Sequence, residues 1–326
     1  MSSLGERRRV TVIVPVYNRE EQLLCCLDSI AAQDYRPLRI IVTDNASTDR
    51  TREAAVEWGA LHSAPELEVI VTDEPTRGAS AARCKGFEAG FGVAPGECED
   101  EVISFFDSDD VMLPGMLSAV MDIFNREPAT EIVAWRMCRR MLDGTTRLSR
   151  RVSDAKSVDM HLVHSFLSTL NYAVRAATLR RAGGWRRGMM EWDDWELGVR
   201  LLLGSPEIKV IDKALVLVNC QSQSITGVDF SSKAGKWERV LDIVEHTLAE
   251  SGRKDRARLR RVVAYRRVIL AAHYSREGHP ELARPLLERA LGTPLLSPLR
   301  RMMLRGAFHY TALGLRGAYT FLRPFI

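Results

Sequence analysis

An apolar stretch of the sequence runs directly into a cluster of acidic residues. Residues 103–106 are largely apolar, and Asp107, Ser108, Asp109 and Asp110 follow them. A buried strand that ends in this way delivers carboxylates to the rim of a sheet, where open α/β folds bind their ligands. Carboxylate oxygens at such a rim suit a hard divalent cation, which in turn favours a polyphosphate. The same residue types are common in plain turns, so the pattern gains weight only from its surroundings.

The acidic cluster belongs to a regular alternation of expected strands and helices. Apolar runs predict strands at residues 10–16, 38–43, 67–72 and 102–106, and helical spacing predicts helices at 20–33, 51–60 and 79–91. Such alternation favours parallel strands with right-handed crossovers and a ligand site at their carboxyl ends. Polar clusters also follow the other three strands: Tyr17 with Asn18, Asp44 with Asn45, and Thr76 with Arg77 and Gly78. Folding would gather all four clusters along one edge of one sheet.

A second acidic cluster follows a glycine-rich loop at residues 183–188. It consists of Glu191, Asp193 and Asp194 with Trp192 among them, and the apolar spacing that follows predicts a helix. Acidic residues at a helix start are favoured by the helix dipole, which is a purely structural explanation. Several carboxylates beside tryptophans are nevertheless costly unless a substrate or cation uses some of them.

Length and composition narrow the class of protein. The chain has 326 residues, 46% hydrophobic and 27% charged, which is typical of a globular protein. This length leaves room for one large α/β domain with an appendage or for two domains of ordinary size. No secretory signal and no apolar run of about 18 residues is visible, so we expect a cytoplasmic protein. The six cysteines have no metal-ligand spacing and include the adjacent pair Cys25 and Cys26, which favours reduced thiols.

The last quarter of the chain has a charge of its own. Residues 251–326 contain 16 basic and four acidic residues, whereas the whole chain has a net charge of +4. The pattern there is helical, and residues 271–290 have the spacing of one helical hairpin similar to a tetratricopeptide unit. Residues 300–326 combine five arginines with large apolar residues and no acid, which fits a helix on an anionic membrane surface. An ordinary helix packed on the hairpin is the alternative. The region has few base-stacking motifs, which argues against a nucleic-acid partner.

Four motifs in order resemble those of the family-2 glycosyltransferases, nucleotide-sugar enzymes of the GT-A fold. They lie at residues 14–20, 40–51, 77–83 and 107–110, and residues 183–185 with 193–197 are similar to the acceptor-side loop of that family. The resemblance implies an α/β protein with a GT-A type nucleotide-binding sheet flanked by helices over residues 1–230. It leaves residues 231–326 as a helical, basic C-terminal region.

The resemblance also implies roles for single residues. Pro15 and Tyr17 would lie against the nucleotide base, Asp44 would hydrogen-bond the base, and Arg77 and Arg83 would flank the diphosphate or base. Asp107 would meet the ribose or sugar, Asp109 would ligate Mg²⁺ or Mn²⁺, and Asp194 would be the catalytic base, with Glu191, Trp192 and Asp193 on the acceptor side. The departures from the family pattern are Asn45 in place of a second acid, Cys84 in place of Asn, Asp193 in place of Glu, and Gln221 or nothing in place of His.

Together these roles imply an inverting, metal-dependent transferase that uses a nucleotide-diphosphate sugar, with a UDP-sugar expected first, and a hydroxyl of a glycan or lipid-linked acceptor. We expect it in the cytoplasm and consider a peripheral position at the inner face of the cell membrane. A sugar-phosphate nucleotidylyltransferase is disfavoured because no glycine-rich phosphate loop lies near the N-terminus. A catalytically degenerate scaffold that only binds nucleotide sugar is disfavoured because Asp107, Asp109 and Asp194 are all present.

Overall fold

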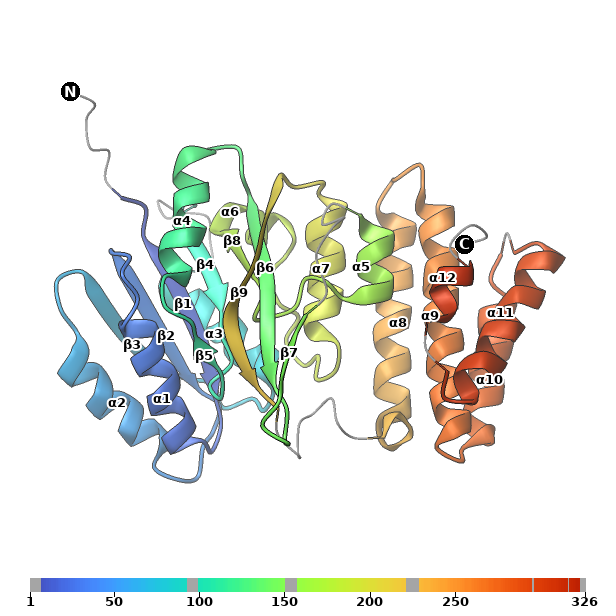
Figure 1. Ribbon diagram of the computed structural model, residues 1–326, viewed down its shortest axis with the longest axis horizontal. Helices are drawn as coiled ribbons and strands as arrows, with labels where there is room; N and C mark the ends of the chain where they lie inside the picture. Colours follow the sequence, from blue (N-terminus) through green and yellow to red (C-terminus); the bar gives the residue numbers. More distant parts are fainter. Residues whose placement is uncertain are drawn as a thin grey trace. The chain divides into compact units, whose positions relative to one another are not determined.

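Nine strands in the described part of the chain form one mixed sheet, which helices cover (Figure 1). The computed structural model describes residues 7–92, 99–149, 157–220, 229–294, 296–315 and 317–322. They divide into two compact units. The first consists of the described residues of Met1–Lys156 and Phe166–Ser222, and the second of those of Ser157–Ser165 and Gln223–Ile326.

The first unit carries the sheet and its covering helices. Its elements in chain order are β1 (Val10–Val16), α1 (Glu20–Ala31), β2 (Leu38–Asp44), α2 (Thr51–His62), β3 (Leu67–Asp73), α3 (Ala79–Phe91), β4 (Val102–Phe105), β5 (Val111–Met112), α4 (Met116–Arg126), β6 (Ile132–Arg140), β7 (Thr146–Leu148), β8 (Tyr172–Arg175), α6 (Ala176–Arg181), α7 (Asp193–Leu203) and β9 (Ile208–Asn219). The strands and helices expected from the sequence up to residue 106 are therefore present, with ends that agree to within two residues.

The strand order is β3-β2-β1-β4-β8-β6-β9-β5, with β7 paired to β6. The first four strands are parallel, as predicted, and their registers place Val16 beside Asp44 and Asp44 beside Asp73. Beyond β4 the sheet is mixed, because β8 runs antiparallel to both β4 and β6. The parallel half therefore ends in one row of loops, where the polar clusters lie.

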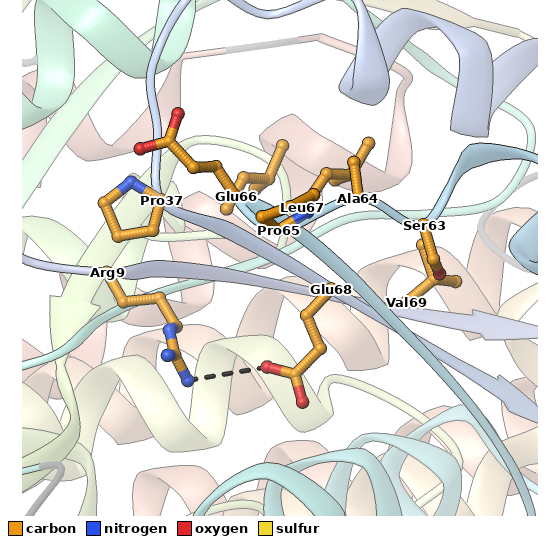
Figure 2. A pocket seen from close by; sticks show the side chains of 10 residues that line it. Arg9, Pro37, Ser63, Ala64, Pro65, Glu66, Leu67, Glu68 and Val69 are labelled. Carbon is orange, nitrogen blue, oxygen red and sulfur yellow. Dashed lines mark hydrogen bonds and ion pairs between the residues drawn. The ribbon is translucent and has the colours of Figure 1, made fainter.

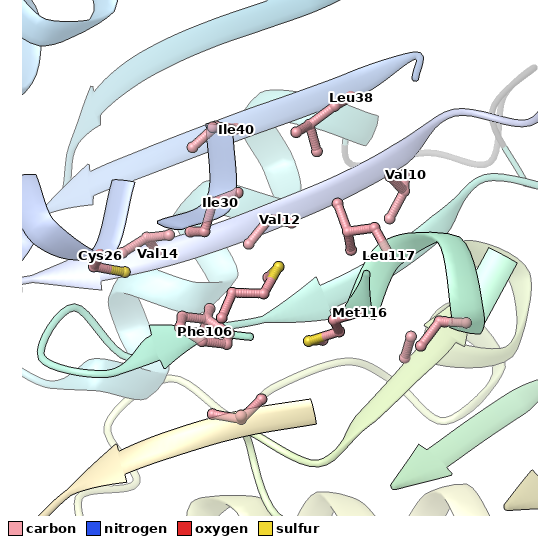
Figure 3. Close-up of a cluster of buried hydrophobic side chains, with 14 of the residues drawn as sticks. Val10, Val12, Val14, Cys26, Ile30, Leu38, Ile40, Phe106, Met116 and Leu117 are labelled. Carbon is pink, nitrogen blue, oxygen red and sulfur yellow. The ribbon is translucent and has the colours of Figure 1, made fainter. Parts of the chain in front are cut away.

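Alternating residues of β1 and β2 face two different helical layers. Val10, Val12 and Val14 of β1 are buried against α1 and α4 in one core (Figure 3), to which Leu27 and Ile30 of α1 contribute. Fully burying one such aliphatic side chain contributes about 1.5–3 kcal/mol, so this core is a major source of the unit's stability.

Helix α3 covers the opposite face of the sheet and lies very close to it. A Cβ atom on Gly86 would stand 2.5 Å from Ile13 Cγ2, and one on Gly90 would stand 2.6 Å from Ile41 Cδ1. The two glycines thus permit an approach that any side chain would prevent. This close packing fixes the N-terminus of α3, and with it Arg83, above the strand ends.

The second unit is helical. Its elements are α5 (Val158–His164), the 3₁₀ turn η2 (Phe230–Lys233), α8 (Ala234–Glu250), α9 (Arg256–Arg276), α10 (Pro280–Leu291), α11 (Pro298–Ala312) and α12 (Ala318–Leu322). Helices α9 and α10 form the expected hairpin, and Val268, Ala290, Leu304 and Tyr319 meet in its core. Helix α11 thus packs an apolar face inward, as the alternative to a purely interfacial helix predicts.

Candidate active site

The carboxyl ends of the four parallel strands bring the predicted polar clusters to one edge of the sheet. Because Val16, Asp44 and Asp73 are register partners, the residues that follow them lie in one row. Asp107 lies two residues beyond β4, which pairs with β1. Side chains from segments up to about 90 residues apart therefore line one site, in the place where open α/β sheets bind ligands.

Tyr17 forms the outer wall of this edge. The residue is 37% exposed, and the Arg77 guanidinium lies over its ring, 3.2 Å from the ring centre. Pro15 is buried in β1, two residues before it. A guanidinium stacked on a phenol ring presents a flat, positively charged surface. Such a surface suits a nucleotide, whose base stacks and whose phosphates are anionic.

Asp44 at the end of β2 has one satisfied and one unsatisfied oxygen. Its Oδ2 accepts a hydrogen bond from the Ser47 amide at 3.0 Å, whereas Oδ1 is buried and has no hydrogen-bond partner in the described structure. A buried acceptor without a donor costs about 1–3 kcal/mol. The Oδ1 atom is therefore suited to an N–H donor from a ligand, such as the imide of a pyrimidine base.

Asn45 connects the end of β2 to the loop before α3. Its Nδ2 donates to the carbonyls of Glu74 and Thr76 at 2.9 and 2.8 Å, and its Oδ1 accepts from the Gly78 amide at 2.7 Å. A carboxylate could not donate to two carbonyls, whereas an amide both donates and accepts. The amide that looked like a departure from the family pattern therefore fixes the loop that carries Arg77.

The Asn45→Ala variant should lower the free energy of unfolding by about 2–4 kcal/mol, because it removes three hydrogen bonds, of which those to Glu74 and Gly78 are buried. Urea denaturation measures this change. Asn125→Ala is the matched control, because Asn125 is exposed on α4 and should change stability by less than about 0.5 kcal/mol. Equal effects of the two substitutions would contradict a structural role for the Asn45 amide.

Arg83 joins the two acidic clusters. It is 5% exposed, and its Nη2 donates to Asp107 at 2.9 Å while its Nη1 donates to Asp193 at 2.8 Å. Its guanidinium also lies 4.5 Å from the ring centre of Trp185. Burial alone would lower the pKa of Arg83, but the charges of Asp193 and Asp107 outweigh burial and raise it. The Arg83 guanidinium therefore links the strand-end cluster (Asp107, Asp109 and Asp110) to the helix-start cluster (Asp193 and Asp194).

The strand-end cluster gathers the three carboxyl groups of Asp107, Asp109 and Asp110 around two arginines. Arg19 forms an ion pair with Asp109. The backbone amide of Asn219 in β9 donates a hydrogen bond to Asp110 Oδ1 at 2.7 Å and so supports the turn. Burial raises the pKa of the Asp109 carboxyl, and Arg19 offsets part of that rise. Burial and the charge of Asp107 raise the pKa of Asp110 to about 8. Like charges crowded in this way favour the arrival of a cation.

The acidic cluster and its surroundings fit a divalent cation that is bound together with a diphosphate. In the part of the chain that the structure describes, no three acidic, His or Cys side chains form a ready-made cage. Mg²⁺ is usually held by one or two carboxylates, with phosphate oxygens and water completing its coordination. Asp109, with Asp107 beside it, supplies oxygen ligands of that kind. Gln221, the predicted position of a further ligand, lies outside the described residues.

The loop before α7 is fixed on α3. Ser80 donates to the Met189 carbonyl at 2.6 Å, and a Cβ on Gly78, whose φ is +132°, would stand 2.8 Å from Met190 Sδ. Farther along, Arg200 donates to both Glu196 oxygens, at 2.8 and 2.7 Å. Glu196 therefore has a structural role and leaves Asp193 and Asp194 as the acids at the start of α7.

Asp194 is the carboxylate of this pair that Arg83 does not hold. Its Oδ1 accepts from the Trp195 amide at 2.7 Å, and the hydroxyl of Tyr172, buried nearby on β8, has no hydrogen-bond partner in the described structure. Burial, followed by the charge of Asp193, raises the pKa of Asp194 to about 6, although Arg83 opposes this shift. Burial and the charge of Asp194 likewise raise the pKa of Tyr172. A carboxylate with a pKa near 6 can accept a proton at neutral pH.

The remaining residues predicted for the acceptor side have different exposures. Glu191 is 4% exposed, whereas Trp192 and Asp193 are half-buried. Trp192 adopts a left-handed conformation with φ of 48° at the start of α7, and its ring lies 5.5 Å from that of Trp195.

Cys84 donates to the Trp185 carbonyl at 3.2 Å, and burial raises the pKa of its thiol to about 11. Cys84 is thus a packing residue of α3.

A cavity of about 470 Å³ lies away from this site (Figure 2). It is lined by residues at the amino ends of β2 and β3, including Leu38, Leu67 and the ion pair between Arg9 and Glu68 at 3.4 Å. Strands of seven residues separate it from the carboxyl ends by about 20 Å. The cavity therefore has no part in the candidate active site.

Comparisons with known proteins agree with this geometry. Residues 11–187 match the model of the glycosyl transferase family 2. The chain is 35% identical over 102 residues to Glycosyltransferase GlyA of Streptococcus pneumoniae, covering 31% of this chain and 13% of that protein. It is 29% identical over 117 residues to the GalNAc(5)-diNAcBac-PP-undecaprenol beta-1,3-glucosyltransferase of Campylobacter jejuni, covering 36% of this chain and 35% of that protein. These matches span about a third or less of each relative's length.

Two solved structures share the fold. S. aureus TarS 1-349 in complex with UDP-GlcNAc has a TM-score of 0.66 at 18% identity, covering 97% of this chain and 92% of that chain. The mannosyltransferase PcManGT from Pyrobaculum calidifontis in complex with GDP-Man and Mn²⁺ has a TM-score of 0.58 at 20% identity, covering 98% and 84%. The likeness confirms the predicted GT-A type sheet flanked by helices. Because the family model matches more than half of its residues, the chain belongs to glycosyl transferase family 2.

Proposed function

We propose that the protein is an inverting, metal-dependent glycosyltransferase that moves a sugar from a nucleotide-diphosphate donor to a hydroxyl group of a glycan or lipid-linked acceptor. The observation that carries this proposal is the position of Arg83 between Asp107 and Asp193. Arg83 brings the strand-end cluster, which would bind the donor, within one side chain of the helix-start cluster, which would face the acceptor. A transferase needs both clusters in one site, whereas a binding scaffold needs only the first.

On the donor side, Pro15, Tyr17 and Arg77 would hold the base, and Asp44 would accept its N–H through the unsatisfied Oδ1. Asp107 would meet the ribose or sugar, and Asp109 would hold Mg²⁺ or Mn²⁺. When bound, a divalent cation stabilises the negative charge that develops on the diphosphate leaving group. UDP is the nucleotide we expect first. TarS, which shares the fold, was solved with UDP-GlcNAc.

On the acceptor side, Asp194 would take the proton of the attacking hydroxyl. One base on the face opposite the leaving group is sufficient for inversion. Asp193 would keep Arg83 in place beside it, while Glu191 and Trp192 would shape the acceptor pocket. The relative from C. jejuni is named for an undecaprenol-linked substrate, which supports a lipid-linked acceptor for this chain as well. The direct test is UDP release from UDP-sugars with Mn²⁺, with and without added acceptors.

A peripheral position at the inner face of the cell membrane would bring this site to such an acceptor. Among the described residues, none of the helices combines the length and the apolar composition that a membrane span requires. Helix α11 buries Leu304 and leaves Leu299 and Met302 exposed, at 50% and 61%, on a helix that also carries Arg301 and Arg305. Exposed apolar groups beside arginines suit an anionic lipid surface, where each basic residue contributes about 1 kcal/mol.

Met302→Glu should lower binding to anionic liposomes by about tenfold, because it places a negative charge where the membrane would lie. Liposome flotation measures this, with Leu61→Glu as the matched control, because Leu61 is 82% exposed on α2. Truncation after Pro298 is a poorer test, because it also removes Leu304 from the core of the second unit. Equal flotation of the wild type and both variants would contradict membrane binding through α11.

A further inference from the structure

Arg19 has a fixed backbone and a partly free side chain. Its amide donates to Thr51 Oγ1 at 2.8 Å, and the neighbouring Asn18 side chain accepts from the Thr48 amide at 2.8 Å. Its carbonyl accepts the first hydrogen bond of α1, from Leu23 at 2.9 Å. The side chain is nevertheless 35% exposed. The guanidinium can therefore change partners while the backbone that carries it stays in place.

In the structure the Arg19 guanidinium pairs with Oδ2 of Asp109. Arg83, the other arginine of the cluster, differs because both of its ends are tied, to Asp107 and Asp193, and it is only 5% exposed. The two arginines thus have unequal freedom to move. Arg19 is the one that can leave its carboxylate without breaking the link between the two clusters.

We propose that Arg19 neutralises Asp109 while the donor is absent and becomes a ligand of the donor diphosphate when a divalent cation takes Asp109. The inference rests on the proposed function, in which Asp109 is the metal ligand. A guanidinium and a divalent cation compete for one carboxylate oxygen, and a displaced guanidinium finds a matching partner in a diphosphate. Arg19 is then both a competitor of the free metal and a positioning residue for the donor.

This double role predicts effects of opposite sign on two equilibria. Arg19→Gln should tighten Mn²⁺ binding without nucleotide by about fivefold, because the ion pair that competes with the metal is worth about 1 kcal/mol. The same change should weaken UDP binding at saturating Mn²⁺ by about tenfold or more, because charge-assisted hydrogen bonds to phosphate are worth about 1.5–3 kcal/mol. An arginine that only supports the fold would not produce both changes.

The test is a pair of calorimetric titrations on the full chain, with Mn²⁺ alone and with UDP at saturating Mn²⁺. Arg50→Gln is the control for net charge, because Arg50 is 67% exposed on the neighbouring turn and pairs with Glu57 at 3.4 Å. It should leave both affinities within about twofold of the wild type. Asp109→Asn identifies the site by removing Mn²⁺ binding.

The expected result is tighter Mn²⁺ and weaker UDP binding for Arg19→Gln alone. If Asp109→Asn abolishes Mn²⁺ binding while Arg19→Gln matches the wild type or Arg50→Gln, the inference is overturned and the proposed function stands. If the wild type binds no Mn²⁺ even with UDP present, the proposed metal site is overturned and the inference with it. Arg19→Lys provides a second check, because a retained charge without a planar fork should recover the metal affinity better than the UDP affinity.

Discussion

Replacing Asp194 with asparagine should lower turnover by about 10²- to 10⁴-fold, the usual contribution of a general base, while UDP affinity changes little. The amide keeps the shape of the carboxylate and the hydrogen bond from the Trp195 amide, but it cannot accept the proton of an acceptor hydroxyl. Steady-state kinetics with a UDP-sugar, together with UDP titration, separate the two quantities.

Asp193→Asn is the matched control for this substitution. Asp193 accepts a hydrogen bond from Arg83 and is expected to position that arginine, so its loss should lower turnover less than the loss of Asp194. A larger effect at Asp193 would mean that Asp193 is the base. A wild-type rate in Asp194→Asn would contradict the acid–base assignment for both residues.

The Asp194→Asn substitution should also make the protein more stable. Because burial raises the pKa of Asp194 to about 6 from an unfolded value near 3.8, its ionisation weakens the folded state as pH rises through that interval. Asparagine removes this cost, so we expect the free energy of unfolding at pH 7 to rise by about 1–3 kcal/mol. Turnover of the wild type should fall as pH drops below about 6, because the protonated base is inactive. Unfolding curves and a pH profile of kcat test both expectations.

Replacing Asp109 with asparagine should abolish metal-dependent turnover, a loss of at least about 10²-fold, because stabilisation of the leaving group by a bound cation is worth several kcal/mol. The fold should survive, since the amide keeps the shape of the carboxylate and Asp109 lies in the turn after β4 with a side chain that is 15% exposed. Rates with Mg²⁺, with Mn²⁺ and with a chelator measure the effect.

Asp110→Asn is the control for the metal ligand, because it makes the same change one residue away. The raised pKa of Asp110, about 8, means that its carboxyl is largely neutral at pH 7 without a bound cation, so an amide resembles it. We expect a loss of less than about tenfold. If Asp110→Asn abolishes metal dependence and Asp109→Asn does not, Asp110 is the ligand instead.

The first half of the sheet could be predicted because its signals are local. The strands β1 and β2 are largely apolar, and helix α1 between them carries apolar residues at helical spacing. The antiparallel strand β8 was harder to predict, since its four residues have no periodicity to detect. The inclusion of α5 in the second unit also had no signal, because it depends on contacts with α9 that are about 100 residues away in sequence.

In the candidate site, too, some residues could be predicted from the sequence and others could not. The carboxylates were visible as motifs, whereas the partners that hold them were not. Arg83 reaches Asp193 across 110 positions, and Asn219 reaches Asp110 across 109. No spacing rule connects residues so far apart, so such pairs emerge only from the fold. Asn45 shows the limit most clearly, because its identity appears anomalous until its three hydrogen bonds to the loop before α3 are known.

Thermal unfolding with a panel of nucleotide sugars, each with and without Mn²⁺, shows whether a metal-dependent nucleotide-sugar site lies at these strand ends. A donor at about 100 times its dissociation constant should add about 2.7 kcal/mol to the free energy of unfolding. We expect this protection with a UDP-sugar and Mn²⁺ together, much less protection without the metal, and none in Asp109→Asn. If no nucleotide sugar protects the protein with either Mg²⁺ or Mn²⁺, or if protection is unchanged by a chelator, a metal-dependent nucleotide-sugar site at these strand ends is contradicted.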